Sequence, residues 1–140
     1  MKTRYSSLVS VKKSTMQKSE RVTQKANADL NSASMALQLS YDSLKEIQSP
    51  SNGKVSNFLA SRTLLDAARG LINHNKEWVG FAKNQVELAK EQLKLDMIEH
   101  EKFKYLELQE IKILLKKIKA EELKELDEVA LMTFARKATN

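Results

Sequence analysis

Hydrophobic and polar positions alternate at helical spacing over two long stretches of this chain. The second stretch, from Val55 to about Lys137, contains no proline, and its only glycines are Gly70 and Gly80. Most of its other residues favour helix. Apolar residues three and four apart form the 3.5-residue repeat of a seam, meaning the row of residues that faces another helix. These seam residues are Leu65, Ala68, Ile72, Asn75, Val79, Ala82, Val86, Ala89 and Leu93.

A weaker seam runs through the first stretch, where the pattern predicts a helix over about residues 5–48. One heptad position holds Val9, Met16, Thr23, Leu30, Leu37 and Leu44, and the other holds Tyr5, Lys12, Ser19, Ala26, Ala33, Ser40 and Ile47. Lys12, Ser19 and Thr23 suit a seam poorly, so the start of this helix is expected to be loosely held.

The segment 49–54 between the two stretches predicts a turn. It contains proline, glycine, asparagine and serine, and proline disfavours helix in the residue before it. Ser6 or Ser7 is the expected N-cap of the first helix, and Ser56 or Asn57 that of the second. A short connection makes two amphipathic helices antiparallel neighbours. The predicted fold class is all-α: a long antiparallel two-helix coiled-coil hairpin, forming one elongated domain over residues 1–140.

Helix length predicts an overhang. A first helix of about 43 residues covers a similar length of the second, to about His100, and the C-terminal helix over 101–137 would project about 50 Å beyond it. The seam slips near residues 96–100, and an apolar row continues in a displaced register at Leu108, Ile111, Leu115 and Ile118. Exposed apolar residues predict a partner for residues 103–126, either a second copy of the chain or a different protein.

Composition agrees with long helices rather than a compact α/β fold. Of the 140 residues, 30% are charged and 6% aromatic, with three glycines and one proline. The absence of cysteine excludes disulfides, thiolate metal sites and a cysteine nucleophile. No segment approaches about 18 uncharged apolar residues, so neither a signal peptide nor a membrane span is expected.

Positive charge is concentrated near the N-terminus. Lysine and arginine outnumber aspartate and glutamate 9 to 4 in residues 1–56 but only 15 to 14 in residues 57–140. In the first 25 residues only Glu20 opposes Lys2, Arg4, Lys12, Lys13, Lys18, Arg21 and Lys25. A solvated helix face and a partner-binding face both explain this cluster. Nucleic acid is disfavoured, since Tyr5 is the only aromatic residue among these charges.

Catalytic chemistry finds no support in the pattern. His74 and His100 are 26 residues apart, and the first helix offers mostly serine, alanine and leucine as further metal ligands. Adjacent acids such as Glu121 and Glu122 point in different directions on a helix. The glycines are scattered rather than gathered in a phosphate-binding loop. We therefore expect no catalytic residue, no cofactor or metal site and no small-molecule substrate.

Two aromatic residues admit two interpretations. Trp78 adjoins seam residue Val79, and Tyr41 adjoins Ser40. Both can therefore be shoulder residues, which lie beside the seam and cover the core from the side. Alternatively, a ridge near the turn forms a docking face. That ridge consists of Leu37, Tyr41, Leu64, Ala68, Leu71 and Asn75.

Both ends of the chain resemble a known family. The start reads Arg4-Tyr5-x-x-Leu8-x-x-Val11, and the end reads Glu122-Leu123-x-x-Leu126-Asp127-Glu128-x-Ala130 with Phe134, Arg136 and Lys137. With the two-helix pattern and a turn near residue 50, these motifs resemble the FliJ family of the bacterial flagellar type III export apparatus over nearly the whole length. The stalk proteins of injectisomes share this plan.

The resemblance implies a non-enzymatic stalk and adaptor in flagellum biogenesis, protein transport and chemotaxis. Such a stalk is similar to that of rotary F-type ATPases. It inserts its termini into a hexameric export ATPase, promotes assembly of the hexamer, links the ring to the membrane export gate protein and handles export chaperones. The implied location is cytoplasmic, peripherally associated with the inner membrane at the flagellar base.

The same resemblance implies two contact regions. The expected ATPase-ring contacts are Arg4, Lys12, Lys13, Lys18, Arg21, Phe103, Leu108, Ile111, Leu115, Ile118, Arg136 and Lys137. The expected export-gate contacts are Leu37, Tyr41, Leu64, Ala68, Leu71 and Asn75.

Two other functions stay open at this stage. One is a structural coiled coil that self-associates through residues 101–126 without an ATPase partner. The other is a basic helix that binds anionic membrane or nucleic acid, which would lose affinity steeply with salt.

Overall fold

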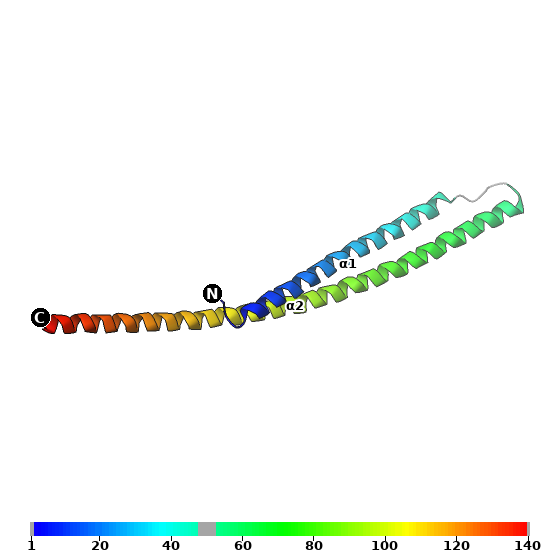
Figure 1. Ribbon diagram of the computed structural model, residues 1–140. Helices are drawn as coiled ribbons and strands as arrows, with labels where there is room; N and C mark the ends of the chain where they lie inside the picture. The colour runs from blue at the N-terminus through cyan, green and yellow to red at the C-terminus, as the bar shows by residue number, and fades with distance from the viewer. Residues whose placement is uncertain (1, 48–52, 140) are drawn as a thin grey trace. The chain divides into compact units, whose positions relative to one another are not determined.

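The computed structural model describes residues 2–47 and 53–139 and contains two helices in this part of the chain. Helix α1 spans Ser6–Glu46, and helix α2 spans Val55–Thr139 (Figure 1). The prediction of an all-α helical hairpin is confirmed. Residues 48–52, which include most of the predicted turn, lie outside the described residues.

Contacts along the chain group it into two units. One unit comprises residues 16–96, and the other comprises residues 1–15 together with 97–140. Both helices contribute to both units. The assignment of one domain to residues 1–140 stays a prediction.

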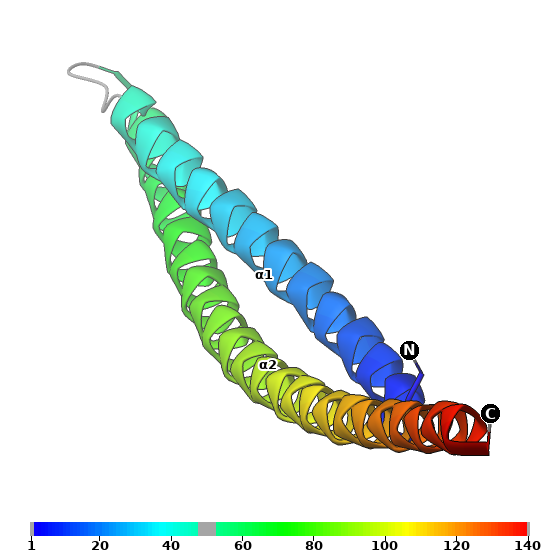
Figure 2. The same cartoon turned by 90° about the vertical axis from the view of Figure 1, so that its left-hand side faces the viewer.

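Within residues 16–96, α1 and α2 lie side by side and run antiparallel (Figures 1 and 2). The predicted seam of α2 is confirmed: every residue named for it is buried or half-buried, while most residues between them are exposed. The apolar centre of the seam consists mainly of small side chains, with Ala33 fully buried. Small side chains let two helices approach closely. The buried apolar residues are Ala26, Ala33, Ile72, Ala82, Val86 and Ala89.

Polar seam residues are satisfied by hydrogen bonds between the helices. The Thr23 hydroxyl donates to the Ser19 carbonyl at 2.9 Å and approaches the Ala89 carbonyl of α2 at 3.3 Å. Ser19 donates to a carboxylate oxygen of Asp96. Both Ser19 and Thr23 are buried, so these two weak seam residues are held by hydrogen bonds rather than left without partners.

The start of α2 depends on glycine. Gly53 has a φ of 151°, a backbone conformation that residues with a Cβ rarely adopt. A Cβ added there would lie 3.0 Å from Nδ2 of Asn57. The Asn57 amide donates to the Lys54 carbonyl at 2.9 Å, which closes the first turn of the helix.

Covered residues of α2 continue as far as Leu114 in the unit of residues 1–15 and 97–140. His100 is buried, and the half-buried residues are Glu99, Phe103, Leu106, Glu107, Gln109, Glu110, Ile111 and Leu114. Because residues off the heptad positions, such as Leu106 and Ile111, are covered as well, the predicted slip of the seam stays a prediction. The displaced apolar row is a second face of α2, one residue and hence about 100° around the helix.

Candidate partner-binding surfaces

The C-terminal part of α2 carries an apolar row in which several large side chains face solvent. Of the five predicted contact residues in this region, Leu108, Leu115 and Ile118 are exposed, whereas Phe103 and Ile111 are half-buried. From Leu115 onward every residue whose side chain is described is exposed. We call the following set the C-terminal stripe: Leu108, Ile111, Leu115, Ile118, Leu123, Leu126 and Val129.

Further exposed apolar residues lie beyond those predicted as contacts. Leu123, Leu126 and Val129 continue the C-terminal stripe, and Met132 and Phe134 follow it. Leu123 and Leu126 lie within the segment 103–126 for which the sequence predicts a partner, and the signal that would have found the others is the absence of charge from residues 129–135, where Thr133 is the only polar residue.

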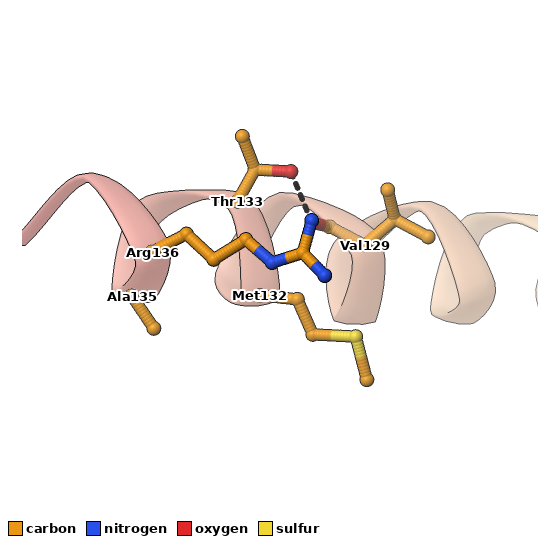
Figure 3. A pocket seen from close by; sticks show the side chains of 5 residues that line it. All are labelled: Val129, Met132, Thr133, Ala135 and Arg136. Atoms are coloured by element: carbon orange, nitrogen blue, oxygen red, sulfur yellow. Dashed lines mark hydrogen bonds between the residues drawn. The ribbon is translucent and has the colours of Figure 1, made fainter. Parts of the chain in front are cut away.

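A shallow hollow near the end of α2 is open on its outer side. Its lining side chains all come from one helix, as Figure 3 shows. The Thr133 hydroxyl donates to the Val129 carbonyl at 2.9 Å, so it is engaged within the helix. Five side chains of a single helix cannot surround a small molecule, and we therefore assign the hollow to the helix surface. They are Val129, Met132, Thr133, Ala135 and Arg136.

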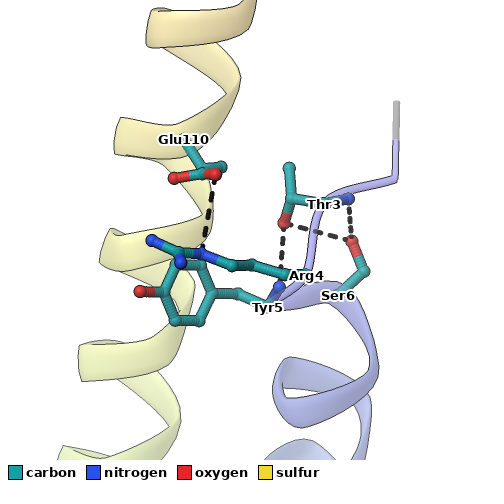
Figure 4. Close-up of polar contacts among 5 residues, drawn as sticks. All are labelled: Thr3, Arg4, Tyr5, Ser6 and Glu110. Atoms are coloured by element: carbon teal, nitrogen blue, oxygen red, sulfur yellow. Dashed lines mark hydrogen bonds and ion pairs between the residues drawn. The ribbon is translucent and has the colours of Figure 1, made fainter.

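Thr3 caps the start of α1. Its hydroxyl accepts a hydrogen bond from the Tyr5 amide at 3.2 Å, and its own amide donates to Oγ of Ser6 at 2.8 Å (Figure 4). This reciprocal pair is a capping box. The predicted cap at Ser6 or Ser7 is therefore wrong, because Thr3 is the N-cap and Ser6, three residues later, is the N3 residue of the box.

Arg4 connects the N-terminal residues to α2. Its Nε lies 3.6 Å from a carboxylate oxygen of Glu110, and its guanidinium carbon lies 4.9 Å from the centre of the Tyr5 ring (Figure 4). The Arg4 side chain is 72% exposed, so solvent screening limits this ion pair to less than about 1 kcal/mol. Arg4 can exchange Glu110 for another acidic group at little cost.

Lys12 occupies a seam position in the same unit. Its Nζ lies 3.7 Å from Glu99 and 5.6 Å from the centre of the Phe103 ring. The structure thus brings together two of the predicted ring-contact residues, Lys12 and Phe103. Lys13, like Lys18 and Arg21 in the other unit, is exposed.

The predicted gate-contact residues divide between the seam and the surface. Leu64 and Leu71 are exposed, while Leu37, Tyr41 and Ala68 are half-buried. Asn75 is buried, and its Nδ2 donates to Oγ of Ser40 and, at 3.3 Å, to the Ala36 carbonyl. Asn75 is thus engaged inside the hairpin.

An outer ridge follows α2 beside the seam in the unit of residues 16–96. Trp78 is 40% exposed and Phe81 62% exposed. More than half of the Trp78 surface is therefore covered beside seam residue Val79, and both interpretations of Trp78 stay predictions. Half-buried Tyr41 lies under Lys76, whose Nζ is 5.9 Å from its ring centre. The outer ridge consists of Leu64, Leu71, Trp78, Phe81, Leu88 and Leu95.

Metal-binding side chains do not gather in the described part of the chain. No group of three or more histidine, aspartate and glutamate residues there is placed to hold a metal ion. His74 is exposed, and Nδ1 of buried His100 lies 3.9 Å from a carboxylate oxygen of Glu101. The features that remain for function are the two apolar surfaces and the basic N-terminal residues.

The two antiparallel helices pack along a heptad seam and leave large apolar side chains on their outer faces. This arrangement defines the class of antiparallel coiled-coil proteins. The family model described as Flagellar FliJ protein matches residues 1–139. The chain belongs to this family, whose members are components of the flagellar export apparatus.

Other comparisons add no relatives. No curated protein and no solved structure gives a significant match. Neither helix, within the residues described, has a stretch apolar and long enough to cross a membrane.

Proposed function

We propose that this protein is the stalk and adaptor of the flagellar export apparatus. Its C-terminal stripe inserts into the hexameric export ATPase and promotes assembly of the ring. The outer ridge of α2 contacts the membrane export gate, and the protein also handles export chaperones. It works at the cytoplasmic side of the inner membrane, at the flagellar base.

One observation carries the ring contact: α2 exposes large apolar side chains from Leu115 onward, where no residue of α1 covers them. Exposed contiguous apolar surface marks a binding site more often than it stays in water. Basic residues of the first 15 positions belong to the same unit as this surface. Arg4 and Lys13 add positive charge to it, which suits an acidic ring lumen.

ATP hydrolysis tests the ring contact. We would measure the rate and the oligomeric state of the export ATPase from the same organism, with and without this protein. We expect the full-length chain to stimulate hydrolysis and hexamer formation, and a chain truncated after Leu114 to do neither. This truncation keeps Glu107, which contacts Ser6 of α1, and Glu110, which contacts Arg4, so the hairpin itself is preserved.

Point variants refine the same test. Leu115→Gln with Ile118→Gln should abolish stimulation, since both side chains are exposed and glutamine keeps the helix. The matched control is Leu88→Gln with Leu95→Gln, two exposed leucines of the outer ridge. Equal stimulation by all variants would rule out the C-terminal stripe as the ring contact.

The gate contact is the second part of the proposal. Leu64 and Leu71 are the exposed members of the predicted set, and they continue into Trp78 and Phe81 on the outer ridge. Leu71→Ala with Trp78→Ala should weaken binding to the cytoplasmic domain of the gate protein. Met35→Ala with Leu39→Ala, on the exposed side of α1, is the control. Unchanged gate binding by the first pair would exclude the outer ridge from this contact.

A further inference from the structure

Two adjoining blocks of opposite charge lie along the C-terminal stripe. Residues 112–119 hold Lys112, Lys116, Lys117 and Lys119 with no acid, and residues 121–128 hold Glu121, Glu122, Glu125, Asp127 and Glu128 with Lys124 as the only base. All of these side chains are exposed. Residues three and four apart meet within one helix, so Lys117 can pair with Glu121, Lys119 with Glu122, and Lys124 with Asp127 or Glu128. Lys112, Lys116 and Glu125 have no opposite charge at this spacing.

The apolar residues between these charges are arranged symmetrically about the same boundary. Leu115 and Leu126 lie equally far from the midpoint between Ala120 and Glu121, as do Ile118 and Leu123. Ile111 and Val129 match to within one residue. A surface with this symmetry is complementary to a reversed copy of itself, which is what an interface on a two-fold axis requires.

We propose that the occupant of the C-terminal stripe is a second copy of this chain, packed antiparallel against residues 111–130. The two-fold axis passes between Ala120 and Glu121. In this arrangement Leu115 of each copy lies at the height of Leu126 of the other, and Ile118 at the height of Leu123. The basic block of each copy lies beside the acidic block of the other. The axes of packed helices lie about 8–10 Å apart. This distance is no longer than the Debye length near physiological salt, about 8–10 Å, so salt does not fully screen the attraction between the two blocks.

The opposite orientation is disfavoured by the same charges. Two parallel copies in register would place lysine beside lysine and glutamate beside glutamate along both blocks, which repels. The antiparallel pair also leaves α1 in place. Leu115 is one residue, and hence about 100° around the helix, from half-buried Leu114 on the side facing α1.

This inference does not rest on the ring contact, but it has a consequence for it. Leu115 and Ile118 belong to both surfaces, so a self-paired chain cannot present them to another protein. Self-pairing and insertion into a ring exclude each other. The dimer would be a reserve form in which the apolar stripe is covered until a partner takes it.

Charge exchange tests the pairing. The full-length chain should sediment at twice its 15.9 kDa mass at micromolar concentration. An acidic variant carries Lys112→Glu, Lys116→Glu and Lys119→Glu, and a basic variant carries Glu121→Lys, Glu122→Lys and Glu125→Lys. Each alone should dimerise about tenfold or more weakly, because like charges now face each other. An equimolar mixture should recover the dimer.

A matched control separates this effect from a change in net charge. Lys83→Glu, Lys90→Glu and Lys94→Glu alter the charge as much as the acidic variant, at exposed positions of α2 outside the stripe. This control should dimerise like the unaltered chain, and circular dichroism should show the same helix content in all variants. If the unaltered chain is still monomeric at about 100 µM, the proposal is overturned, because the dissociation constant of the dimer would then lie well above that concentration.

Single cysteines determine the orientation, because the chain has none of its own. Leu115→Cys and Leu126→Cys lie at equal height in the antiparallel pair, whereas identical positions are far apart. Oxidation should therefore cross-link a mixture of the two variants and leave each variant alone uncross-linked, since a disulfide needs Cα atoms about 4.4–6.8 Å apart. Efficient cross-linking of each variant with itself would indicate a parallel dimer and overturn the proposal.

Discussion

Asn75 of α2 donates a hydrogen bond from Nδ2 to Oγ of Ser40 on α1, and both side chains are buried in the seam. Ser40 in turn donates to the Ala36 carbonyl at 2.8 Å, and Asn75 reaches the same carbonyl. A buried polar pair of this kind costs stability if either partner is lost. It also favours one register, because a shift of one helix along the other removes the partners of the Asn75 amide, while Ser40 keeps its bond to Ala36.

Removing Asn75 should therefore destabilise the hairpin. We expect Asn75→Ala to lower the free energy of unfolding by about 1–2 kcal/mol, through the lost hydrogen bonds and the small cavity. Urea denaturation followed by circular dichroism measures this change. Asn73→Ala, two residues away on the exposed side, is the control and should change it little.

Close packing at Ala33 predicts sensitivity to a larger side chain. Ala33 is fully buried, so Ala33→Leu should force the helices apart and cost about 1–3 kcal/mol. The same substitution at exposed Ala28 should be neutral. A comparison of melting temperatures tests both, and equal melting temperatures would mean that the seam at Ala33 accommodates leucine.

Two glycines should respond to alanine with opposite sign. Gly53→Ala places a Cβ on a backbone with positive φ and should destabilise by about 1 kcal/mol or more. Gly80→Ala lies within α2, where nothing is within 4 Å of the added Cβ, and should stabilise by about 0.5–1 kcal/mol. Thermal unfolding of the two variants measures the difference, and a stabilising Gly53→Ala would contradict the assigned turn conformation.

The first turns of α1 should open more readily than its middle. Residues 4–15 are held to α2 by partly exposed polar contacts such as Arg4 with Glu110 and Lys12 with Glu99, which are weak and screened by salt. Around Ala26 the helix packs on Val86 and Ala89 instead. Hydrogen exchange followed by mass spectrometry should show faster exchange in 6–15, increasing with added salt. Uniform protection along α1 would contradict this.

The candidate surfaces were predictable only in part. The apolar residues Leu115 and Ile118 stand out from sequence because they leave the α1-facing repeat, and the structure exposes both. The predicted gate set mixed exposed Leu71 with buried Asn75, although the heptad spacing already assigns Asn75 to the seam.

By itself the sequence determined the two helices and the seam from Leu65 to Leu93, because propensity and 3.5-residue spacing are local properties of the chain. Only the tertiary structure decided how Ser19, Thr23 and Asn75 are satisfied, since those hydrogen bonds depend on which residue of the other helix lies opposite. It also decided that residues of α2 past His100, as far as Leu114, are still partly covered. Polar side chains can occupy a seam wherever the opposing helix supplies partners, and an apolar pattern cannot reveal them.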